Sequence, residues 1–447
     1  MWKRGEMISV QPSASAISSA VPAGRYRWLV CGLLFASTTI CYMDRQIFGL
    51  LKPVLDGELG WSETDYGDIV AVFSLLYACG YLFGGRLMDW IGVRRGLTIA
   101  VAGWSISAAL HGLMASVIGF KIARGALGLS EGGNFPASIK AVREWFPPRE
   151  RALATGLFNA GSNVGAIVTP ISLPFIVAAF GWRVAFLIAG ALGLLWLAAW
   201  LRFYERPERQ KRLSAEELAY IRAGETPATV ARPRWIALFR YRGTWAYALG
   251  MLLTSPVWWF YLNWVPGFLH QRFGIDMMAS IAPLVTIYLI ADIGSIAGGW
   301  ISSRLIGGGM PVLRARIVAM LCMASCTVPV ALVSGAASMW PAVLLIALAA
   351  AGHQGLSANL YTIVSDTVPA TAVSSVIGIG GFAAGVMGMF VAMAIGRILD
   401  ATGGNYMLLF IGAATAYPLA VLLMALILRG PRPPAAHSNP TMMMEPQ

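Results

Sequence analysis

Four charged side chains stand inside stretches of the sequence that are otherwise apolar. The segment YMDRQ contains Asp44 and Arg45, and the segment RGALGLSEGGNFPASIK contains Arg124 and Glu131. Charges are costly inside a lipid bilayer, so they usually mark function there. An arginine fork matches a carboxylate at two points, and a desolvated glutamate beside a changing positive charge can load and release a proton. These residues predict an anion clamp beside a protonatable group.

The spacing of the second pair supports this interpretation. Arg124 and Glu131 are seven residues apart, which places them on nearly the same face of a helix at about 100° per residue. The alternative is a set of static ion pairs that hold two helices together. Buried ion pairs are weak evidence for stability, so we favour the functional interpretation.

The composition indicates a protein whose helices must lie in a membrane. The chain has 447 residues, 57% hydrophobic and only 12% charged, with a net charge of +12. Soluble domains carry about 25% charged residues, and disordered chains are poor in apolar residues. The five cysteines and four histidines show no CxxC or HxxxH spacing. The sequence also contains no evident nucleophile–base pair. We therefore expect a protein that is not an enzyme and that binds no metal ion and no cofactor.

About twelve apolar stretches are long enough to cross a bilayer, which takes roughly 20 residues each. They predict an all-α integral membrane protein with twelve transmembrane helices in two six-helix halves, the plan of transporters built from repeated halves. The expected divisions are a disordered tail (1–27), an N-terminal bundle (28–203), a linker (204–243), a C-terminal bundle (244–429) and a second tail (430–447).

The charged residues outside these stretches predict the orientation. Lys and Arg gather in alternate loops and in the linker, which is the positive-inside pattern, so both termini should be cytoplasmic. The linker should contain an amphipathic helix, capped by Ser214 with Glu217 three residues on. We expect a multi-pass protein of a cell membrane, with a bacterial inner membrane as the setting. We expect the protein to be surrounded by the lipid bilayer and to be a monomer. We do not expect it to bind nucleic acid.

A glycine-rich basic loop follows the second predicted span. It reads GGRLMDWIGVRR, and a weaker copy, GGWISSRLIGGG, follows the eighth span. Glycines allow two helix ends to approach, while an acidic residue and arginines bridge neighbouring helices. The first copy is similar to the GxxxDxxGxRR loop of the major facilitator superfamily and predicts a gating loop made by Gly85, Asp89, Gly92, Arg94 and Arg95.

Polar and aromatic residues recur at helical spacing in other spans. Rings can stack on the C–H faces of a sugar while amides and hydroxyls bind its OH groups. An interfacial belt or helix packing is the alternative for the tryptophans, and a satisfied core position is the alternative for His353. The substrate-binding candidates in these stretches are Asn134, Asn163, Trp259, Asn263, Gln354, Ser357 and Asn359. Whether His353 and Asp292 take part stays open.

Taken together, the chain resembles the anion:cation symporter family within the major facilitator superfamily. The resemblance runs from about Trp28 to Leu428 and is closest to bacterial hexuronate transporters, with galactonate transporters, vesicular glutamate transporters and sialin as relatives. It implies an alternating-access fold and proton-coupling roles for Asp44 and Glu131. It also implies that Arg45, Arg124 and Tyr77 serve the carboxylate site or gating.

These observations lead to one functional hypothesis with stated rivals. We expect proton-coupled import of a sugar-acid carboxylate, a hexuronate such as glucuronate or galacturonate. Sodium is the alternative coupling ion. Aldonate symport or organic-anion exchange on the same fold is the nearest rival, and a transporter-like membrane sensor is a remote one. The individual sugar acid stays open, because Ser255 stands where hexuronate-like sequences are expected to carry an Asp.

Overall fold

The computed structural model describes residues 24–147, 150–222, 235–368 and 373–429. Within these ranges every regular element is a helix. The N-terminal half comprises α1 (Tyr26–Leu50), α2 (Lys52–Leu59), α3 (Glu63–Ile91), α4 (Val93–His111), α5 (Val117–Glu131), α6 (Asn134–Trp145), α7 (Arg151–Phe180) and α8 (Trp182–Phe203). Residues 1–23 of the predicted N-terminal tail and the whole predicted C-terminal tail, 430–447, lie outside the described residues.

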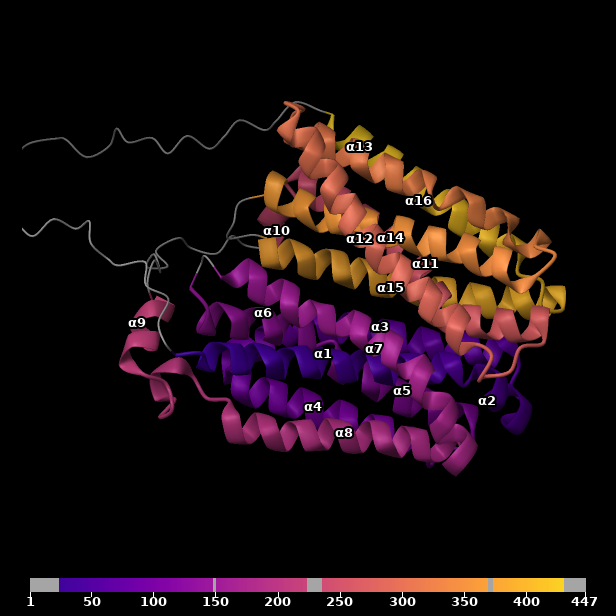
Figure 1. The fold of residues 1–447 in the computed structure, drawn as a ribbon, viewed down its shortest axis with the longest axis horizontal. Coiled ribbons are helices and arrows are strands. Elements are labelled where there is room, and N and C mark those ends of the chain that lie inside the picture. Colours follow the sequence, from indigo (N-terminus) through magenta and orange to yellow (C-terminus); the bar gives the residue numbers. More distant parts are fainter. Residues whose placement is uncertain (1–23, 148–149, 223–234, 369–372, 430–447) are drawn as a thin grey trace, which may run out of the picture.

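The second half follows the connecting segment between α8 and α11. That segment contains η1 (Pro207–Arg209), α9 (Ala215–Arg222) and α10 (Trp235–Leu238). The remaining helices are α11 (Arg242–Phe273), α12 (Ile281–Gly307), α13 (Val312–Ser325), η2 (Val328–Gly335), α14 (Met339–Thr367), α15 (Val373–Thr402) and α16 (Met407–Leu428). Figure 1 shows the two halves side by side, with α9 at one end of the molecule and α2 at the other.

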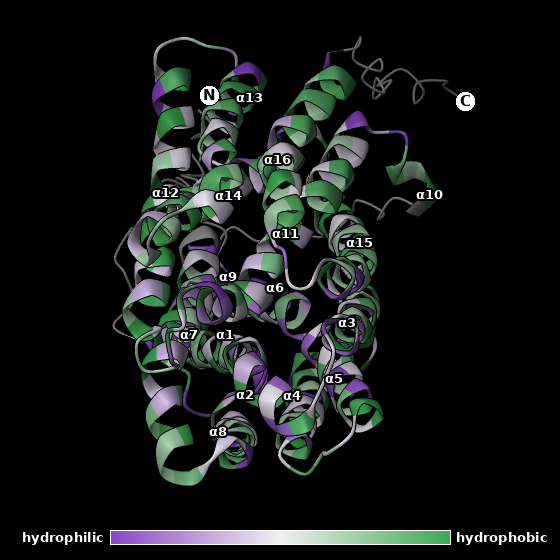
Figure 2. Ribbon diagram, turned by 90° about the vertical axis from the view of Figure 1, so that its right-hand side faces the viewer, coloured by the Kyte–Doolittle hydropathy of each residue, from purple (hydrophilic) through white to green (hydrophobic). Residues whose placement is uncertain are grey.

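The long helices are suited to a lipid environment. In the described chain, eight segments are long and apolar enough to cross a membrane; they lie in α3, α7, α8, α12, α13 with η2, α14, α15 and α16. The four remaining predicted spans correspond to α1, α4, α11 and the pair α5–α6. Bulky apolar side chains such as Ile122 and Ile296 are largely exposed on helix surfaces. Figure 2 shows hydrophobic residues along all the long helices.

Local signals explain several helix ends. Ser62 begins α3 with a reciprocal capping box: its hydroxyl accepts from the Asp65 N–H, and the Asp65 carboxylate accepts from the Ser62 N–H. The predicted Ser214 cap is confirmed, because its hydroxyl accepts the Glu217 N–H at 3.1 Å. The Glu217 side chain, however, binds elsewhere in the molecule.

The predicted fourth span is broken into two helices. α5 ends at Glu131 and α6 begins at Asn134, with Gly132 and Gly133 between them. A Cβ atom on Gly132 would lie 2.5 Å from the backbone nitrogen of Tyr81, so only glycine allows α3 to approach this closely. The break places the Glu131 carboxylate at the end of a half-helix inside the bundle.

The two halves are closed against each other at the α2 end. The Asp400 carboxylate at the end of α15 accepts the backbone N–H groups of Glu63 and Thr64, at 3.0 and 2.8 Å. Lys52, whose side chain is buried, donates to Asp56 and Glu63. A carboxylate at a helix N-terminus is stabilised by the unpaired N–H groups and by the helix dipole. One half thus caps a helix of the other.

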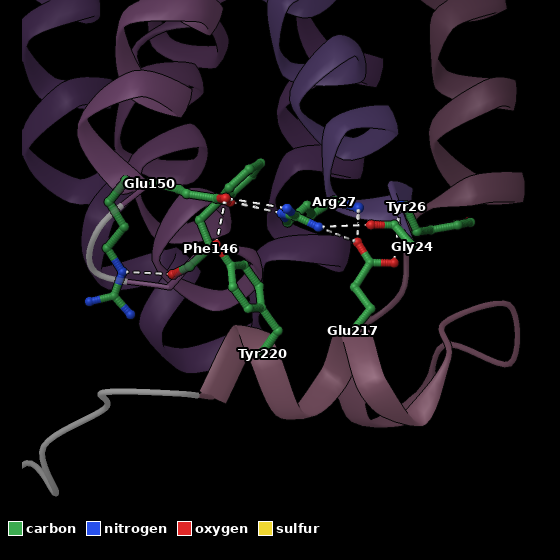
Figure 3. A network of polar contacts seen from close by, with 8 residues as sticks. Gly24, Tyr26, Arg27, Phe146, Glu150, Glu217 and Tyr220 are labelled. Atoms are coloured by element: carbon green, nitrogen blue, oxygen red, sulfur yellow. Dashed lines mark hydrogen bonds and ion pairs between the residues drawn. The ribbon is translucent and has the colours of Figure 1, made fainter. Parts of the chain in front are cut away.

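At the opposite end, α9 is attached to the N-terminal half. The guanidinium of Arg27, 1% exposed, binds Glu150 at 2.8 Å and Glu217 at 3.0 Å. Glu217 also accepts the backbone N–H groups of Tyr26 and Arg27, and Tyr220 donates to Glu150. Burial alone would raise the pKa of Glu150, but these hydrogen bonds outweigh it and hold the pKa below its usual value. Figure 3 shows the network.

Candidate functional site

A cavity lies between the two halves. Helices α1, α3 and α5 supply one wall and α11 supplies the other. Its lining combines two arginines, aromatic rings and amides: Tyr42, Arg45, Gln46, Val70, Phe73, Arg124, Trp258, Trp259, Leu262 and Asn263. Four predicted site residues therefore meet here: Arg45, Arg124, Trp259 and Asn263.

Arg45 is held by an acid and by aromatic faces. Its Nε donates to Oε2 of Glu131 at 2.6 Å, and the Glu131 side chain is fully buried. The Arg45 guanidinium also lies 4.4 Å from the Tyr77 ring centre and 5.0 Å from that of Tyr42. A charge-assisted hydrogen bond of this kind is strong in an interior of low dielectric. A change in the charge of Glu131 therefore acts directly on Arg45.

Arg124 stands in a different situation. It is 2% exposed and its guanidinium lies between the rings of Phe48 and Phe73, each 4.6 Å away. Its Nη2 makes a long contact of 3.4 Å to the Arg45 carbonyl, and its Nε and Nη1 donate to no described group. Buried donors without acceptors are expensive. The cavity thus presents cationic donors that an anionic ligand would satisfy.

Asp44 lies on another side of α1. It is buried, and neither carboxylate oxygen accepts a hydrogen bond from the described residues. It lines a second cavity between α1, α7 and α8, whose lining also contains the hydroxyl side chains of Thr169 and Ser172. An ionised carboxylate without donors is costly in such a setting, which favours a group that carries a proton. Asp44 and Arg45 are adjacent in sequence but serve separate cavities.

Two tryptophans of α11 line the cavity, and a different residue packs against each of them. Trp258 stacks on His353 of α14, with ring centres 4.8 Å apart and planes 6° apart. Trp259 reaches across to the N-terminal half, where it meets the edge of Tyr77 at 5.9 Å. Asn263 donates to the Trp259 carbonyl one turn earlier in α11. Trp259 therefore contacts both halves, whereas Trp258 packs on His353 within the C-terminal half.

The remaining predicted residues lie outside the lining of this cavity. Tyr77 packs on Arg45, and Asn134 accepts a hydrogen bond from Ser37 at 3.1 Å. Ser357 contacts the ring nitrogen of His353 at 3.4 Å. Asn359 is fully buried and donates to the carbonyl of Gly298, which joins α14 to α12. Asn163 of α7 accepts from Ser162 at 3.3 Å, and Gln354 is half-buried in α14.

The predicted gating loop joins helices of the N-terminal half. Gly92 has a positive φ of 83° between α3 and α4, a conformation that favours glycine. Arg94 binds Glu205 just after α8 and donates to the Leu201 carbonyl. Arg95 is exposed, and Gly85 and Asp89 lie in α3, where their side chains fall outside the described part. The arginine contact therefore lies within one half.

Sequence reasoning did not select several residues of the cavity. Tyr42 and Gln46 belong to the YMDRQ segment itself, and Gln46 also accepts from Tyr288 of α12 at 3.2 Å. Phe73 lies one turn before Tyr77 on α3. Helical spacing from Arg45 could have found Tyr42 and, one turn further on, Gln46; spacing from the predicted Tyr77 could have found Phe73. Trp258 had the same sequence signal as Trp259, and only packing separates their roles.

Several known proteins are similar to this chain in sequence or in fold. The family model described as Major Facilitator Superfamily matches residues 34–392. A hexuronate transporter of Escherichia coli (strain K12) is 30% identical over 384 residues, covering 84% of this chain and 88% of that protein. A probable L-galactonate transporter of the same strain is 30% identical, covering 91% and 93%. A crystal structure of a D-xylose-proton symporter matches with a TM-score of 0.69 at 15% identity, covering 90% and 97%.

Proposed function

Because this chain belongs to the major facilitator superfamily, we propose that it imports a sugar-acid carboxylate by proton symport through alternating access. The substrate we propose is a hexuronate such as glucuronate or galacturonate. The observation that carries the proposal is the cavity between the halves, where the unmatched donors of Arg124 lie beside the Arg45–Glu131 pair. The similarity to a hexuronate transporter supports the substrate class.

The geometry suggests how a proton and a carboxylate are coupled. Arg45 donates to Glu131, so its Nε is already taken when Glu131 is ionised. A proton on Glu131 removes the charge that holds Arg45 and frees the guanidinium for the substrate. The substrate carboxylate then lies between Arg45 and the free donors of Arg124. Loss of the proton restores the ion pair and displaces the substrate.

Asp44 is the second proton site of this scheme. Its carboxylate has no donor among the described residues and lines the cavity between α1, α7 and α8. Two protons with one monoanion would carry one net positive charge inward, worth about 2.3 kcal/mol per 100 mV of membrane potential. The basic loops make the α9 end cytoplasmic, in a bacterial inner membrane. Protein monomers suffice for this cycle.

Uptake into proteoliposomes tests the coupling. Wild-type protein should accumulate radiolabelled galacturonate when the outside is acidic, and the flux should fall when the pH gradient is collapsed. Glu131→Gln should lose this accumulation and keep counterflow, because the neutral amide cannot release a proton. Glu144→Gln is the matched control, since Glu144 is bound by Tyr204 away from the cavity. A wild-type flux that ignores the gradient, or a Glu131→Gln protein that still accumulates substrate, contradicts the scheme.

Aldonate symport or organic-anion exchange is the second candidate. The similarity to a probable L-galactonate transporter favours it. Counterflow of galactonate that proceeds equally well without a pH gradient and exceeds that of galacturonate would support this candidate. Replacement of the proton gradient by a sodium gradient identifies the coupling ion in the same vesicles.

A further inference from the structure

Trp258 is the cavity residue whose position depends most clearly on another side chain. It lines the cavity from α11, and His353 of α14 covers one face of its indole at 4.8 Å in a nearly parallel stack. His353 is 6% exposed and is not part of the cavity lining. Any influence of His353 on a ligand therefore passes through Trp258.

The imidazole is itself fixed at both nitrogens. Its Nδ1 lies 3.0 Å from the hydroxyl of Tyr417, which is fully buried in α16 and also reaches the Thr254 carbonyl at 3.5 Å. Its Nε2 lies 3.4 Å from Ser357, one turn along α14. A ring that is hydrogen-bonded at both nitrogens cannot rotate freely, so its flat face stays parallel to the indole. The stack joins α11, α14 and α16.

The two walls of the cavity offer different chemistry. The N-terminal half presents the arginines, which suit a carboxylate, and α11 presents a large aromatic surface. A pyranose has a nearly flat C–H face that can lie on an indole, whereas an open-chain aldonate has no such face and loses more rotational freedom on binding. An indole held at a fixed angle therefore discriminates between these two forms of sugar acid.

We propose that His353 is a positioning residue that makes the site selective for the ring form of a sugar acid over an open-chain one, by holding Trp258 in place. The proposal rests on the proposed function, because it assumes that the cavity binds a sugar acid. It adds a specificity determinant from the second half of the chain, away from the charged residues.

The test compares galacturonate with galactonate, two six-carbon monoanions, in proteoliposomes. The Michaelis constant and the turnover of each are measured for wild type, His353→Ala and His353→Phe. Wild type should prefer galacturonate. In His353→Ala the galacturonate KM should rise about tenfold while the galactonate KM changes less than twofold, and turnover should persist. His353→Phe should restore most of the preference, because a flat ring again supports the indole.

Two further variants complete the design. Tyr417→Phe keeps the ring and removes the hydroxyl that holds His353, so it should give a smaller shift in the same direction. It also carries the test if His353→Ala does not fold. His111→Ala is the matched control, because His111 is also buried and stacked, on Phe186 at 5.0 Å, but lines neither cavity. It should leave the ratio of the two KM values unchanged.

The outcomes separate the two proposals. A fall in turnover for both substrates at unchanged KM, or an equal rise of both KM values, would mean that His353 only stabilises the fold and would overturn the inference. Wild-type protein that takes up galactonate in preference also overturns it, while sugar-acid transport stands. Wild-type protein that transports neither compound overturns the proposed function and the inference with it.

Discussion

Arg45 and Arg124 both line the central cavity, yet their guanidinium groups stand in different states. Arg45 is neutralised by Glu131, at 2.6 Å. Arg124 lies between two phenyl rings and its Nε and Nη1 donate to no described group. The unmatched group gains most from an incoming carboxylate, since its donors are desolvated already. We therefore expect Arg124 to contribute most to affinity and Arg45 to contribute most to coupling.

The first prediction concerns Arg124→Lys. Lysine keeps the positive charge but loses the two-point fork, so the KM for the transported sugar acid should rise about tenfold, which corresponds to about 1.4 kcal/mol. Arg183→Lys is the control, because Arg183 is an exposed partner of Glu58 outside both cavities. Initial rates of uptake over a range of substrate concentrations measure the change. An unchanged KM would place the carboxylate elsewhere.

The second prediction concerns the pH dependence of Asp56, which lies in α2 beyond the end of α1. Burial raises the pKa of Asp56 to about 6, and the neighbouring Lys52 only partly offsets this. The closed arrangement thus binds the proton more tightly than an arrangement in which Asp56 is solvated. Closure at the α2 end is favoured below pH 6 and loses this advantage as the pH rises through about 6.

A cysteine in place of Ala392, which is buried between the halves near this end, reports the opening. Its labelling by a membrane-impermeant maleimide, divided by the rate for a free thiol at the same pH because only the thiolate reacts, should accelerate between pH 5 and pH 7, relative to the parent protein with its native cysteines. Asp56→Asn should remove the acceleration. Labelling that is equally pH-dependent in Asp56→Asn would exclude Asp56 as the titrating group.

At the scale of elements, close packing of α3 on α15 determines the closure of the α2 end. A Cβ on Gly67 would lie 2.6 Å from the Ala392 carbonyl, and one on Gly396 would lie 2.4 Å from the Glu63 carbonyl. Asp400 then caps the N-terminus of α3 across the interface. The backbones of α3 and α15 are in direct contact here, so no flexible side chain can move aside when a larger residue replaces either glycine.

The third prediction follows from this contact. Gly67→Leu cannot be accommodated in the closed arrangement, so the protein should shift towards an arrangement that is open at the α2 end. Labelling of a cysteine at position 392 should become at least tenfold faster than in the unsubstituted background. Gly57→Leu is the control, because no atom lies within 4 Å of its Cβ position. Equal labelling rates in the two variants would contradict the role of this interface.

At the scale of the whole molecule, α9 of the connecting segment is attached to the first half, whereas Leu238 of α10 packs in the core of the second half. Glu217 of α9 binds the Arg27 side chain and the first N–H groups of α1, and Tyr220 contacts Glu150 at the start of α7. Helix α9 thus moves with the N-terminal half in any rigid-body motion of the two halves. Figure 1 shows α9 at the end of that half opposite to α2.

The fourth prediction concerns the stability of this attachment. Glu217→Ala removes an acceptor from a buried guanidinium and from two backbone N–H groups, so it should destabilise the protein by about 1–3 kcal/mol. Glu216→Ala is the control, because the Glu216 side chain, next to Glu217 in the sequence, is exposed. Thermal unfolding in detergent measures both. A melting temperature equal to that of wild type in Glu217→Ala would mean that α9 is not held by these contacts.

Much of the architecture could be predicted from the sequence. The membrane class, the all-α fold in two halves and the Ser214 cap all depend on hydropathy and on interactions between residues a few positions apart. These signals come from residues that are close together in the sequence, so they can be recognised without knowledge of the packing. Placement of Arg45 and Arg124 together also follows the general rule that charges inside spans face the interior.

Only the tertiary structure decided which neighbours these residues meet. Adjacent residues on α1 serve separate cavities, because each helix residue is turned by about 100° from the last. Trp258 rests on His353, far away in the sequence, and Glu217 caps α1 rather than completing its own helix cap. Helix register and close contacts between glycines set these pairings. Composition and periodicity carry no information about either, whereas they are sufficient to determine that the chain forms membrane helices with a charged interior.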